Sequence, residues 1–491
     1  MSVNSAIGPN TRDATQLPVV LAPDTIASPG IEFLRMQQKW ELHSDLWNGT
    51  ERMRQRSVRW LPQEEGESDK AYKARLKRTF LFNGYKSTIQ RLAGQVFFRP
   101  VNVENVPSEL QYLENDFDSE GRSLTEVAHD LLIKMLRYGK AHGIVDYPSG
   151  TSNLTLAEER ELKVRPYFTE IDPRDLIAWR SRRVGGADIL EQIRIQEYVV
   201  EPFDEHQEIE TYRIRAFYPD EIRVYSLRQN ENAEAYTLED EMTNTLGKIP
   251  LVTAYGAKTG FLTAEPPLDD LAWLNLRHWQ STSDQNTILH VTRVPIFFAK
   301  GFEDGELENT TIGPYRGIST SSENADIDYI EHSGEAIGAG RQDLRDLEEQ
   351  MHEIGADLLV SRSVDRQTAS ARSIDRAESL SMLQTMVMSL ERLIKDAYVM
   401  AGEWIGVDAS DVRVSISEEF RIPVEANPTE DLVNLYEKGI VSYDRFVSEL
   451  QRRGTLSESK NGLTEPEEIN ANEPSPWTNE QENEVEETDP E

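Results

Sequence analysis

Apolar side chains recur every three or four residues in several stretches, which is the period of a helix buried along one face. In the range 68–96 they stand at positions 81, 85, 89, 92 and 96. A second stretch begins at Ser123, a good helix-capping residue, and ends before Gly139. A third covers 32–60. We predict helices over these ranges, with a short apolar strand at 143–147 after the second.

Between 164 and 251 the period shortens to two. Alternating runs rich in β-branched and aromatic residues occupy 193–200, 212–218 and 222–227, separated by Pro, Asp and Asn. Such runs with turn residues between them are typical of neighbouring strands in an antiparallel sheet. This part of the chain is predicted to form an antiparallel meander.

A helical pattern returns over 268–292, although 280–287 contains no apolar side chain. A helix with such a polar band either stands in water or meets polar neighbours. Pro295 ends it, and a Gly-rich stretch of strands and loops is predicted over 296–330.

Two heptad seams follow, each with apolar positions spaced alternately three and four residues apart. The first occupies 344, 347, 351, 354 and 358, in a helix predicted over 341–359. The second occupies 380, 383, 387, 390, 394, 397, 401 and 404. A helix over 374–405 would be ~48 Å long at 1.5 Å per residue, and its seam must be covered along that length. The polar segment 361–373 between the seams is predicted to be a loop. It carries Arg362, Asp365, Arg366 and Arg372.

Both ends of the chain have a different character. Residues 1–30 are rich in Pro, Ser, Thr and Asn and are predicted to form a flexible arm. A short strand at 412–416 and small helices around 432–438 and 443–453 precede a solvated tail. From 465 to 491 that tail holds eleven acidic residues and no Lys or Arg, a composition that favours disorder.

Composition limits the possible functions. The chain has 491 residues and 38% hydrophobic residues, which is enough for two to four compact units. It has no cysteine, which excludes disulfides, thiolate metal sites and cysteine nucleophiles, and we find no run long enough to span a bilayer. The 87 acidic residues against 52 basic ones give a net charge of −35. Tight, sequence-reading DNA binding is not expected of such a chain; solubility and repulsion between copies are the simpler explanations of the charge.

Motifs that carry chemistry are weak. Residues 256–260 have the Lys and Thr of a phosphate-binding loop, but Ala257 replaces the glycine before the lysine, and a surface turn is favoured. Gly334, Gly338 and Gly340 have the dinucleotide spacing in reverse, and we interpret them instead as a loose entry to the helix that begins at Arg341. The eight histidines form no pair at metal-ligand spacing. Adjacent acidic pairs such as Glu348-Glu349 point apart on a helix and favour a solvated surface. We expect no enzyme, cofactor or metal site.

Three stretches resemble the portal proteins of tailed double-stranded DNA bacteriophages: 83–100 with Asn83-Gly84-Tyr85, 266–281 with Trp273-Leu274-Asn275 and His278-Trp279-Gln280-Ser281, and 329–334. The resemblance covers roughly 36–456. It implies an α+β, mainly helical fold with wing, stem, clip, tunnel loop and crown. The implied order is a flexible arm (1–30), a wing (31–260), a first stem helix (261–294), a clip (295–334), a second stem helix (335–360), a tunnel loop (361–373), a long helix (374–405), a crown (406–463) and a disordered acidic tail (464–491).

The resemblance also implies a function. Portal proteins form a ring of twelve copies at one capsid vertex, through which the genome is packaged and ejected. The implied partners are further copies of the chain, the terminase large subunit, the major capsid protein, scaffolding protein, a head-to-tail adaptor and double-stranded DNA that passes without sequence specificity, with no membrane. Assembly would take place in the host cytoplasm and the final location would be the virion. In a closed ring, the next subunit can cover an exposed seam, and the polar band 280–287 would face neighbouring stems and solvent.

A mechanism for the acidic charge follows from this resemblance. An acidic bore repels DNA, so that a moving duplex is not held at any step. Arg362, Arg366 and Arg372 of the tunnel loop would supply transient phosphate contacts, although ion pairs between subunits explain these arginines equally well. Two other functions remain open: another ring-forming head-to-tail adaptor, normally a much shorter chain, and an acidic hydrolase with a cleft of carboxylates.

Overall fold

The computed structural model describes residues 25–148, 164–202, 204, 206–230, 233–292, 296–302, 324–330, 335–357, 382–416, 433, 436, 442, 443, 445 and 446. The chain divides into two compact units, Met1–Phe420 and Arg421–Glu491. In the second unit the rings of Tyr436 and Phe446 stack with centroids 4.6 Å apart. The described residues there are helical except Ser442, at positions where small helices are predicted. The expected acidic tail lies outside the described residues.

The first predicted helix is divided. Helix α1 (Ile31–Asn48) and helix α2 (Thr50–Arg56) are separated by Gly49, and a 3-10 turn η1 (Ser57–Arg59) follows. Gly49 has φ +82°, a conformation that glycine adopts readily and that interrupts a helix. The 32–60 range is therefore helical, but in three pieces.

Residues 25–30, expected to belong to the flexible arm, pack against the sheet. The Gly30 amide donates a hydrogen bond to the Ile177 carbonyl at 2.8 Å, and Arg194 Nη1 donates to the Ile26 carbonyl at 2.7 Å. Ile26 and Ala27 contact the core beneath α1. The remainder of the expected arm, 1–24, lies outside the described residues.

The prediction of one helix over 68–96 is wrong. Helices α3 (Asp69–Arg78) and α4 (Gly84–Val96) occupy this range. Asn83 accepts a hydrogen bond from the Lys86 amide through its side chain at 2.9 Å, so it starts a new helix. The apolar period continues across the break because Leu81, in the connector, is buried as deeply as a helical residue.

Helix α5 (Leu124–Tyr138) confirms its prediction at both ends. Ser123 and Glu126 form a capping box, each side chain bonded to the other's backbone. Gly139 ends the helix in the left-handed conformation with φ +80°, and a Cβ there would lie 2.0 Å from the Glu265 carbonyl oxygen. Only glycine fits at this position.

Strand β2 (Lys140–Asp146) is the centre of a three-stranded antiparallel sheet, between β3 (Tyr167–Ile171) and β9 (Leu251–Tyr255). It begins three residues earlier than predicted, because Lys140 and His142 are buried despite their polarity. Lys140 Nζ donates to the Leu262 carbonyl at 2.8 Å. His142 Nδ1 lies 2.8 Å from Thr253 Oγ1.

The predicted meander is confirmed. Strands β4 (Leu176–Val184), β5 (Ala187–Pro202), β6 (Glu208–Phe217), β7 (Glu221–Asn230) and β8 (Ala233–Thr243) lie side by side in chain order, each antiparallel to the next. One face packs against α1 through Ile214. On the other face, Ile193 and Phe217 meet Ile144 of β2. The smaller sheet and α1 therefore cover parts of opposite faces of the meander.

Three short elements complete the body: η2 (Ser108–Glu114), and the strands β10 (Lys258–Gly260) and β11 (Thr263–Ala264), which pair with each other. The predicted strand at 412–416 is present as β14 (Arg413–Ser415). It pairs antiparallel with β1 (Asn102–Glu104). The start of the expected crown is thus hydrogen-bonded to the expected wing.

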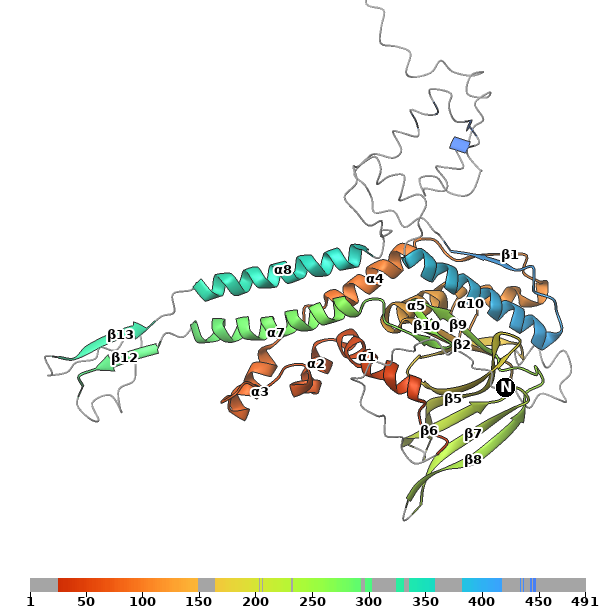
Figure 1. The fold of residues 1–491 in the computed structure, drawn as a ribbon, viewed down its shortest axis with the longest axis horizontal. Helices are drawn as coiled ribbons and strands as arrows, with labels where there is room; N and C mark the ends of the chain where they lie inside the picture. The colour runs from red at the N-terminus through yellow and green to blue at the C-terminus, as the bar shows by residue number, and fades with distance from the viewer. Residues whose placement is uncertain are drawn as a thin grey trace, which may run out of the picture. The chain divides into compact units, whose positions relative to one another are not determined.

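Helix α10 (Met382–Ile405) is the described part of the long helix expected over 374–405. It lies across the body, where it packs on β9, α5, β2 and β14 (Figure 1). Seam positions such as Val387, Leu390 and Ile394 are buried, and so are Met386, Leu393 and Tyr398 outside the seam. Because this apolar stripe is wider than a coiled-coil seam, α10 is a core helix. Its own chain covers it, and no neighbouring subunit is required.

The described residues combine helices with antiparallel sheets, so the predicted α+β class is confirmed. In the part of the chain that the structure describes, no helix combines the length and apolar character needed to cross a membrane.

Candidate functional site: a helical arm and its anchor

The candidate functional element is a helical arm. It is made of α7 (Asp269–Thr292), β12 (Ile296–Lys300), β13 (Asp326–Ile330) and α8 (Glu335–Asp357). Helices α7 and α8 lie side by side (Figure 1). Strands β12 and β13 pair antiparallel, with Ile296 opposite Ile330 and Lys300 opposite Asp326. The helix predicted at 268–292 and the strands predicted after it are confirmed, while 303–323 lie outside the described residues.

Helix α8 begins six residues earlier than the 341 expected from the seam. Gly338 and Gly340, interpreted as a loose entry to the helix, are inside it. Among the described seam positions, Leu347 and Met351 are buried and Leu344 and Ile354 are half-buried. Met351 lies against α4, where a Cβ on Gly84 would be 3.2 Å from its sulfur. This seam is also covered within the chain, by α7 and α4.

Polar contacts fix the register between α7 and α8. Gln285 Nε2 donates to the Ile337 carbonyl at 3.1 Å, and His278 Nε2 lies 3.3 Å from Glu348 Oε1. Burial lowers the pKa of His278, while the hydrogen bond to Glu348 opposes that shift. Near Gln285 the two helices approach closely, because a Cβ on Gly340 would lie 2.1 Å from Gln285 Oε1.

The polar band 280–287 on α7 meets polar partners in its own chain. Ser283 is fully buried and accepts a hydrogen bond from Arg75 Nη1 of α3 at 3.3 Å. Gln280 Nε2 donates to the Trp60 carbonyl at 3.0 Å. The expectation that the band faces neighbouring stems and solvent is therefore wrong for Ser283 and Gln285, which are buried between α3 and α8.

Arg75 is itself held in place by an acidic partner. Its Nη2 lies 2.8 Å from Glu67 Oε2, and this buried ion pair sits beside the α3–α7 contact. The hydrogen bond from Arg75 lowers the pKa of Glu67, and the same bond raises that of Arg75. The α3 side of the arm is therefore joined to α7 by a charged side chain whose position is fixed.

Asn275 anchors the arm to the body. Its Oδ1 accepts from the Tyr85 amide at 2.8 Å, and its Nδ2 donates to the Phe82 carbonyl at 2.8 Å. The side chain is fully buried. It thus satisfies two backbone groups at the start of α4 and fixes α7 against that helix.

A second anchor lies one and a half turns earlier on α7. His43 of α1 is buried between Tyr85 and Asp269, with Nδ1 2.8 Å from the Tyr85 hydroxyl and Nε2 3.0 Å from Asp269 Oδ1. The hydrogen bond from His43 lowers the pKa of Asp269, and burial raises the pKa of Tyr85. A carboxylate only accepts hydrogen bonds, so Nε2 carries a proton toward Asp269; in a neutral imidazole Nδ1 then accepts from the Tyr85 hydroxyl.

These anchors explain the stretch 266–281, which gave the most specific resemblance. Asn275, His278 and Trp279 are all buried, and they hold the arm to the body and to α8. The sequence identified these residues as a signature without revealing their role. The sequence did contain a signal for this role. Asn275 and His278 share a helix face with the apolar Leu268 and Leu271. A polar side chain on such a buried face requires a hydrogen-bond partner.

The residues proposed for the tunnel loop, Arg362, Asp365, Arg366 and Arg372, lie outside the described residues. So do the acidic pairs Glu158-Glu159 and Glu418-Glu419. In the pair Glu348-Glu349, Glu348 contacts His278 and Glu349 is exposed.

The weak phosphate-loop pattern at 256–260 covers the two-residue turn after β9 and the whole of strand β10. Lys258 Nζ lies 4.7 Å from the centre of the Tyr255 ring. No helix follows Lys258 directly, so this segment lacks the structure that would bind a phosphate.

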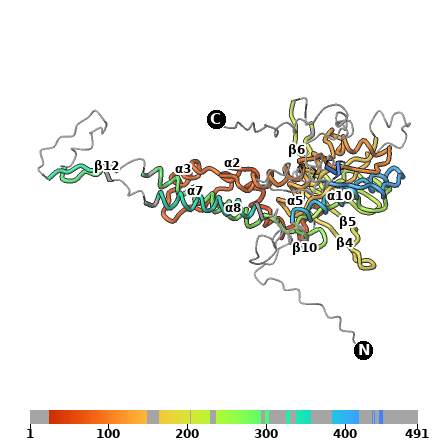
Figure 2. The backbone as a smooth tube through the Cα atoms, turned by 90° about the horizontal axis from the view of Figure 1, so that it is seen from above, coloured from red at the N-terminus to blue at the C-terminus, as the bar shows by residue number. Residues whose placement is uncertain are grey.

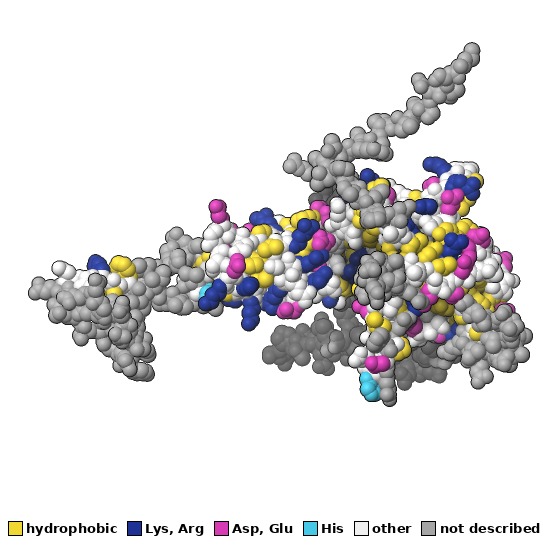
Figure 3. All heavy atoms as spheres, turned by 90° about the horizontal axis from the view of Figure 1, so that it is seen from below, with side chains coloured by type: hydrophobic (Ala, Val, Ile, Leu, Met, Phe, Trp, Pro, Cys, Tyr) yellow, Lys and Arg dark blue, Asp and Glu magenta, His cyan; other side chains and the backbone are white. Residues whose placement is uncertain are grey.

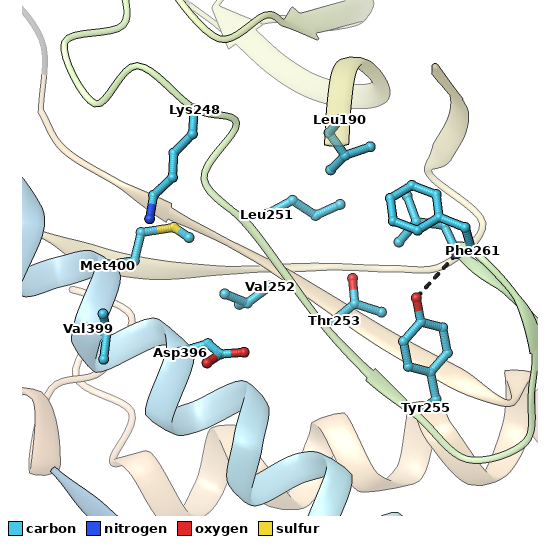
Figure 4. Close-up of a pocket in the computed structure, with 11 residues that line it drawn as sticks. Leu190, Lys248, Leu251, Val252, Thr253, Tyr255, Phe261, Asp396, Val399 and Met400 are labelled. Carbon is cyan, nitrogen blue, oxygen red and sulfur yellow. Dashed lines mark hydrogen bonds between the residues drawn. The ribbon is translucent and has the colours of Figure 1, made fainter. Parts of the chain in front are cut away.

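A cavity of about 320 Å³ lies between β9 and α10 (Figure 4). Asp396 is the single carboxylate among its lining residues, and burial raises the pKa of that carboxyl. Lys248, also in the lining, pairs with Glu403 at 2.5 Å. The paired carboxylates that acid–base hydrolysis uses are not found in this lining. Within the described ranges, no cluster of three or more His, Asp or Glu is arranged to hold a metal.

Comparisons with known proteins give one family match. The model of a domain of unknown function (DUF4055) matches residues 267–405, from just before α7 to the last residue of α10. No curated protein matches the chain.

Similar solved structures come from gene transfer agent (GTA) particles. The neck of an empty GTA particle, computed with C6 symmetry, is 11% identical, with 75% of this chain and 89% of that chain covered and a TM-score of 0.38. The neck of a native GTA particle, computed with C12 symmetry, is 11% identical, with 74% and 88% covered and a TM-score of 0.39. A chain from the virion of a native GTA particle is 12% identical, with 82% of this chain and 98% of that chain covered and a TM-score of 0.38. TM-scores below 0.5 do not establish a common fold.

Proposed function

We propose that this chain is the portal protein of a tailed double-stranded DNA bacteriophage, a subunit of a ring at one capsid vertex. The observation that carries the proposal is the helical arm. It has two antiparallel helices joined through a two-stranded hairpin, and it is followed along the chain by a long helix that packs on the body. These elements correspond in order to the stem, the clip and the long helix that the sequence resemblance implies.

The way the arm is held supports a mechanical role. Helix α7 is joined to α8 through Gln285, to α3 through Ser283 and to α4 through Asn275. Each of these buried side chains makes at least one hydrogen bond across a helix contact, and such bonds favour a single arrangement. A wall element that is held on three sides would keep its position while DNA moves past it.

The proposed ring is a non-enzymatic conduit. Its acidic charge would keep a duplex from binding tightly during passage, since held phosphates would add barriers to movement. A separate motor, the terminase large subunit, would supply the work of packaging and dock on the hairpin. The major capsid protein and scaffolding protein would surround the ring during assembly in the host cytoplasm, and a head-to-tail adaptor would later take the place of the terminase in the virion.

Purification of the full chain, followed by mass photometry and negative-stain microscopy, tests this function. We expect rings of about twelve copies with a central hole, as closed cyclic symmetry requires. A monomer at every concentration, without rings, would remove the proposal. Hydrolytic activity of such a monomer would favour the acidic hydrolase instead.

Removal of the protein from an infection separates a portal from an adaptor. Without a portal, no DNA enters the capsids, because packaging needs the channel from the start. Without an adaptor, capsids fill and then leak. Filled capsids in the absence of this protein, measured as nuclease-protected DNA, would therefore favour the adaptor function.

A further inference from the structure

Helix α3 carries a row of lysines on its outer face. Lys70, Lys73 and Lys77 are exposed and spaced three and four residues apart, so they share one helix face. The opposite face holds Tyr72 and Arg75, which are buried. Within the described ranges, no ion pair joins these three lysines to an acidic side chain. Figure 3 shows Lys and Arg side chains gathered along this part of the molecule. We call this set the lysine row.

Helix α8 carries a row of opposite sign with the same spacing. Asp346, Glu349 and Glu353 are exposed on the face opposite the buried Leu347 and Met351. Asp346 accepts a hydrogen bond from Gln342, one turn earlier on the same helix. None of the three forms an ion pair with a described residue. This set is the acidic row, and each row is about 10 Å long at 1.5 Å per residue.

The two rows face in opposite directions. Ser283 binds α3 and Gln285 binds α8, and residues two apart on a helix point to nearly opposite sides. Helix α7 therefore lies between α3 and α8 (Figures 1 and 2). The lysine row is on one outer surface of this three-helix layer, and the acidic row is on the other.

On both sides of α7 the chain passes in the same direction. From Arg75 in α3 to Phe82 beyond its end, the chain moves along α7 from Ser283 to Asn275. From Ile337 to Glu348 it moves along α7 from Gln285 to His278, so α8 is antiparallel to α7. The two rows have the same spacing and the same length.

We propose that, in the ring, the lysine row of each copy contacts the acidic row of its neighbour. This inference rests on the proposed ring and names the surfaces that close it. A head-to-tail contact repeated by rotation is what a cyclic assembly requires, and two complementary surfaces on opposite sides of one layer supply it. The contact sets orientation and register more than affinity, since exposed charge pairs act mainly in those ways.

The geometry adds one constraint. The lysine row lies beside the C-terminal half of α7, and the acidic row lies beside its N-terminal half. Rotation about a ring axis preserves height along that axis, so the rows meet only when the arm is inclined to the axis. An inclined arm is therefore part of the proposal.

The decisive experiment reverses the charge of one row at a time and then mixes the two variants. The first variant carries Lys70→Glu, Lys73→Glu and Lys77→Glu, so both of its outer faces are acidic. The second carries Asp346→Lys, Glu349→Lys and Glu353→Lys, so both of its outer faces are basic. A control carries Arg180→Glu, Arg182→Glu and Arg183→Glu on β4, which are also exposed; Arg182 pairs with Glu191 of the neighbouring strand at 2.8 Å. Circular dichroism establishes that each variant is folded.

Ring formation is measured by mass photometry in 0.15 M salt. We expect each row variant alone to need at least about tenfold more protein than the wild type to form rings, because like charges then face each other. An equimolar mixture of the two should form rings at wild-type concentrations, since every contact again joins opposite charges. The control should assemble as the wild type does.

Two results overturn the pairing while leaving the ring intact: row variants that assemble alone like the wild type, or a mixture that assembles no better than its components. Failure of the wild-type chain to form any ring would instead remove the proposed function, and the pairing with it. Rings of the wild type with arms parallel to the axis would also contradict the pairing.

Discussion

Asn275 on α7 accepts a hydrogen bond from the Tyr85 amide of α4 at 2.8 Å, with its side chain fully buried. The same side chain donates to the Phe82 carbonyl. One amide group thus completes the backbone bonding of the segment that leads into α4, and it joins that segment to the arm.

Substitution of this anchor should destabilise the protein. Asn275→Leu removes both hydrogen bonds and leaves a buried amide and a buried carbonyl without that partner, at a cost of about 1–3 kcal/mol for each unsatisfied group. We expect a loss of about 2–4 kcal/mol in the free energy of unfolding, measured by urea denaturation. Arg277→Ala on the same helix is the control, because its side chain is 64% exposed, and it should change stability by less than about 0.5 kcal/mol. Equal effects of the two substitutions would contradict the anchoring role.

The two glycines inside α8 should respond differently to alanine. A Cβ on Gly338 meets open space, so Gly338→Ala should stabilise the chain by about 0.5–1 kcal/mol through helix propensity. Gly340→Ala gains the same propensity, but it displaces Gln285 and breaks the bond to Ile337, which offsets the gain by about 1 kcal/mol. In a Gln285→Ala background, Gly340→Ala should then stabilise as Gly338→Ala does. Thermal unfolding of the four variants measures this cycle, and additive effects would exclude the contact.

The sequence predicted elements best where local rules decide them. Ser123 and Gly139 define both ends of α5 by capping and by a left-handed glycine, and the meander follows from alternation and turn residues. These signals lie within a few residues of each other. Tertiary context adds little there, so the pattern was sufficient.

Elements were misplaced where the deciding partner is distant in sequence. Strand β2 begins at Lys140 because the carbonyl of Leu262, over a hundred residues away, accepts a hydrogen bond from the Lys140 side chain. The seam on α10 indicated a coiled coil, but β9 and α5 cover it. Ser283 looked solvent-exposed because nothing local reveals Arg75. The arm and its order were predictable from the sequence, whereas its anchors depend on contacts that no spacing encodes.

Lys140 should make stability depend on pH. Burial lowers its pKa from 10.5 to about 7. Between those values the unfolded chain binds a proton that the folded chain does not, so stability rises with pH through this window. In this window, Lys140 raises the free energy of unfolding by about 1.4 kcal/mol per pH unit. Below pH 7 both states are protonated and the contribution becomes constant.

Lys140→Met removes that contribution. Urea denaturation at pH 7.5, 8.5 and 9.5 measures this. The free energy of unfolding of the wild type should rise relative to that of the variant by about 1.4 kcal/mol per pH unit. Lys39→Met, at a half-exposed lysine, is the control and should leave the slope unchanged. A difference that is constant with pH would show that Lys140 keeps an ordinary pKa in the folded chain.

The three arginines in 361–373 allow a test of DNA contact in the proposed channel. If Arg362, Arg366 and Arg372 touch phosphates transiently, their joint replacement with alanine should leave rings intact and reduce DNA packaging or retention, measured as nuclease-protected DNA per capsid. Replacement with lysine keeps the charge and should preserve most of the function, because a phosphate contact of this kind needs charge more than guanidinium geometry. If the arginines instead form ion pairs between subunits, the alanine variant should lose rings before it loses packaging. Packaging and retention at wild-type levels with intact rings would remove any role for these arginines in DNA passage, since a bore that repels DNA along its whole length would then be sufficient.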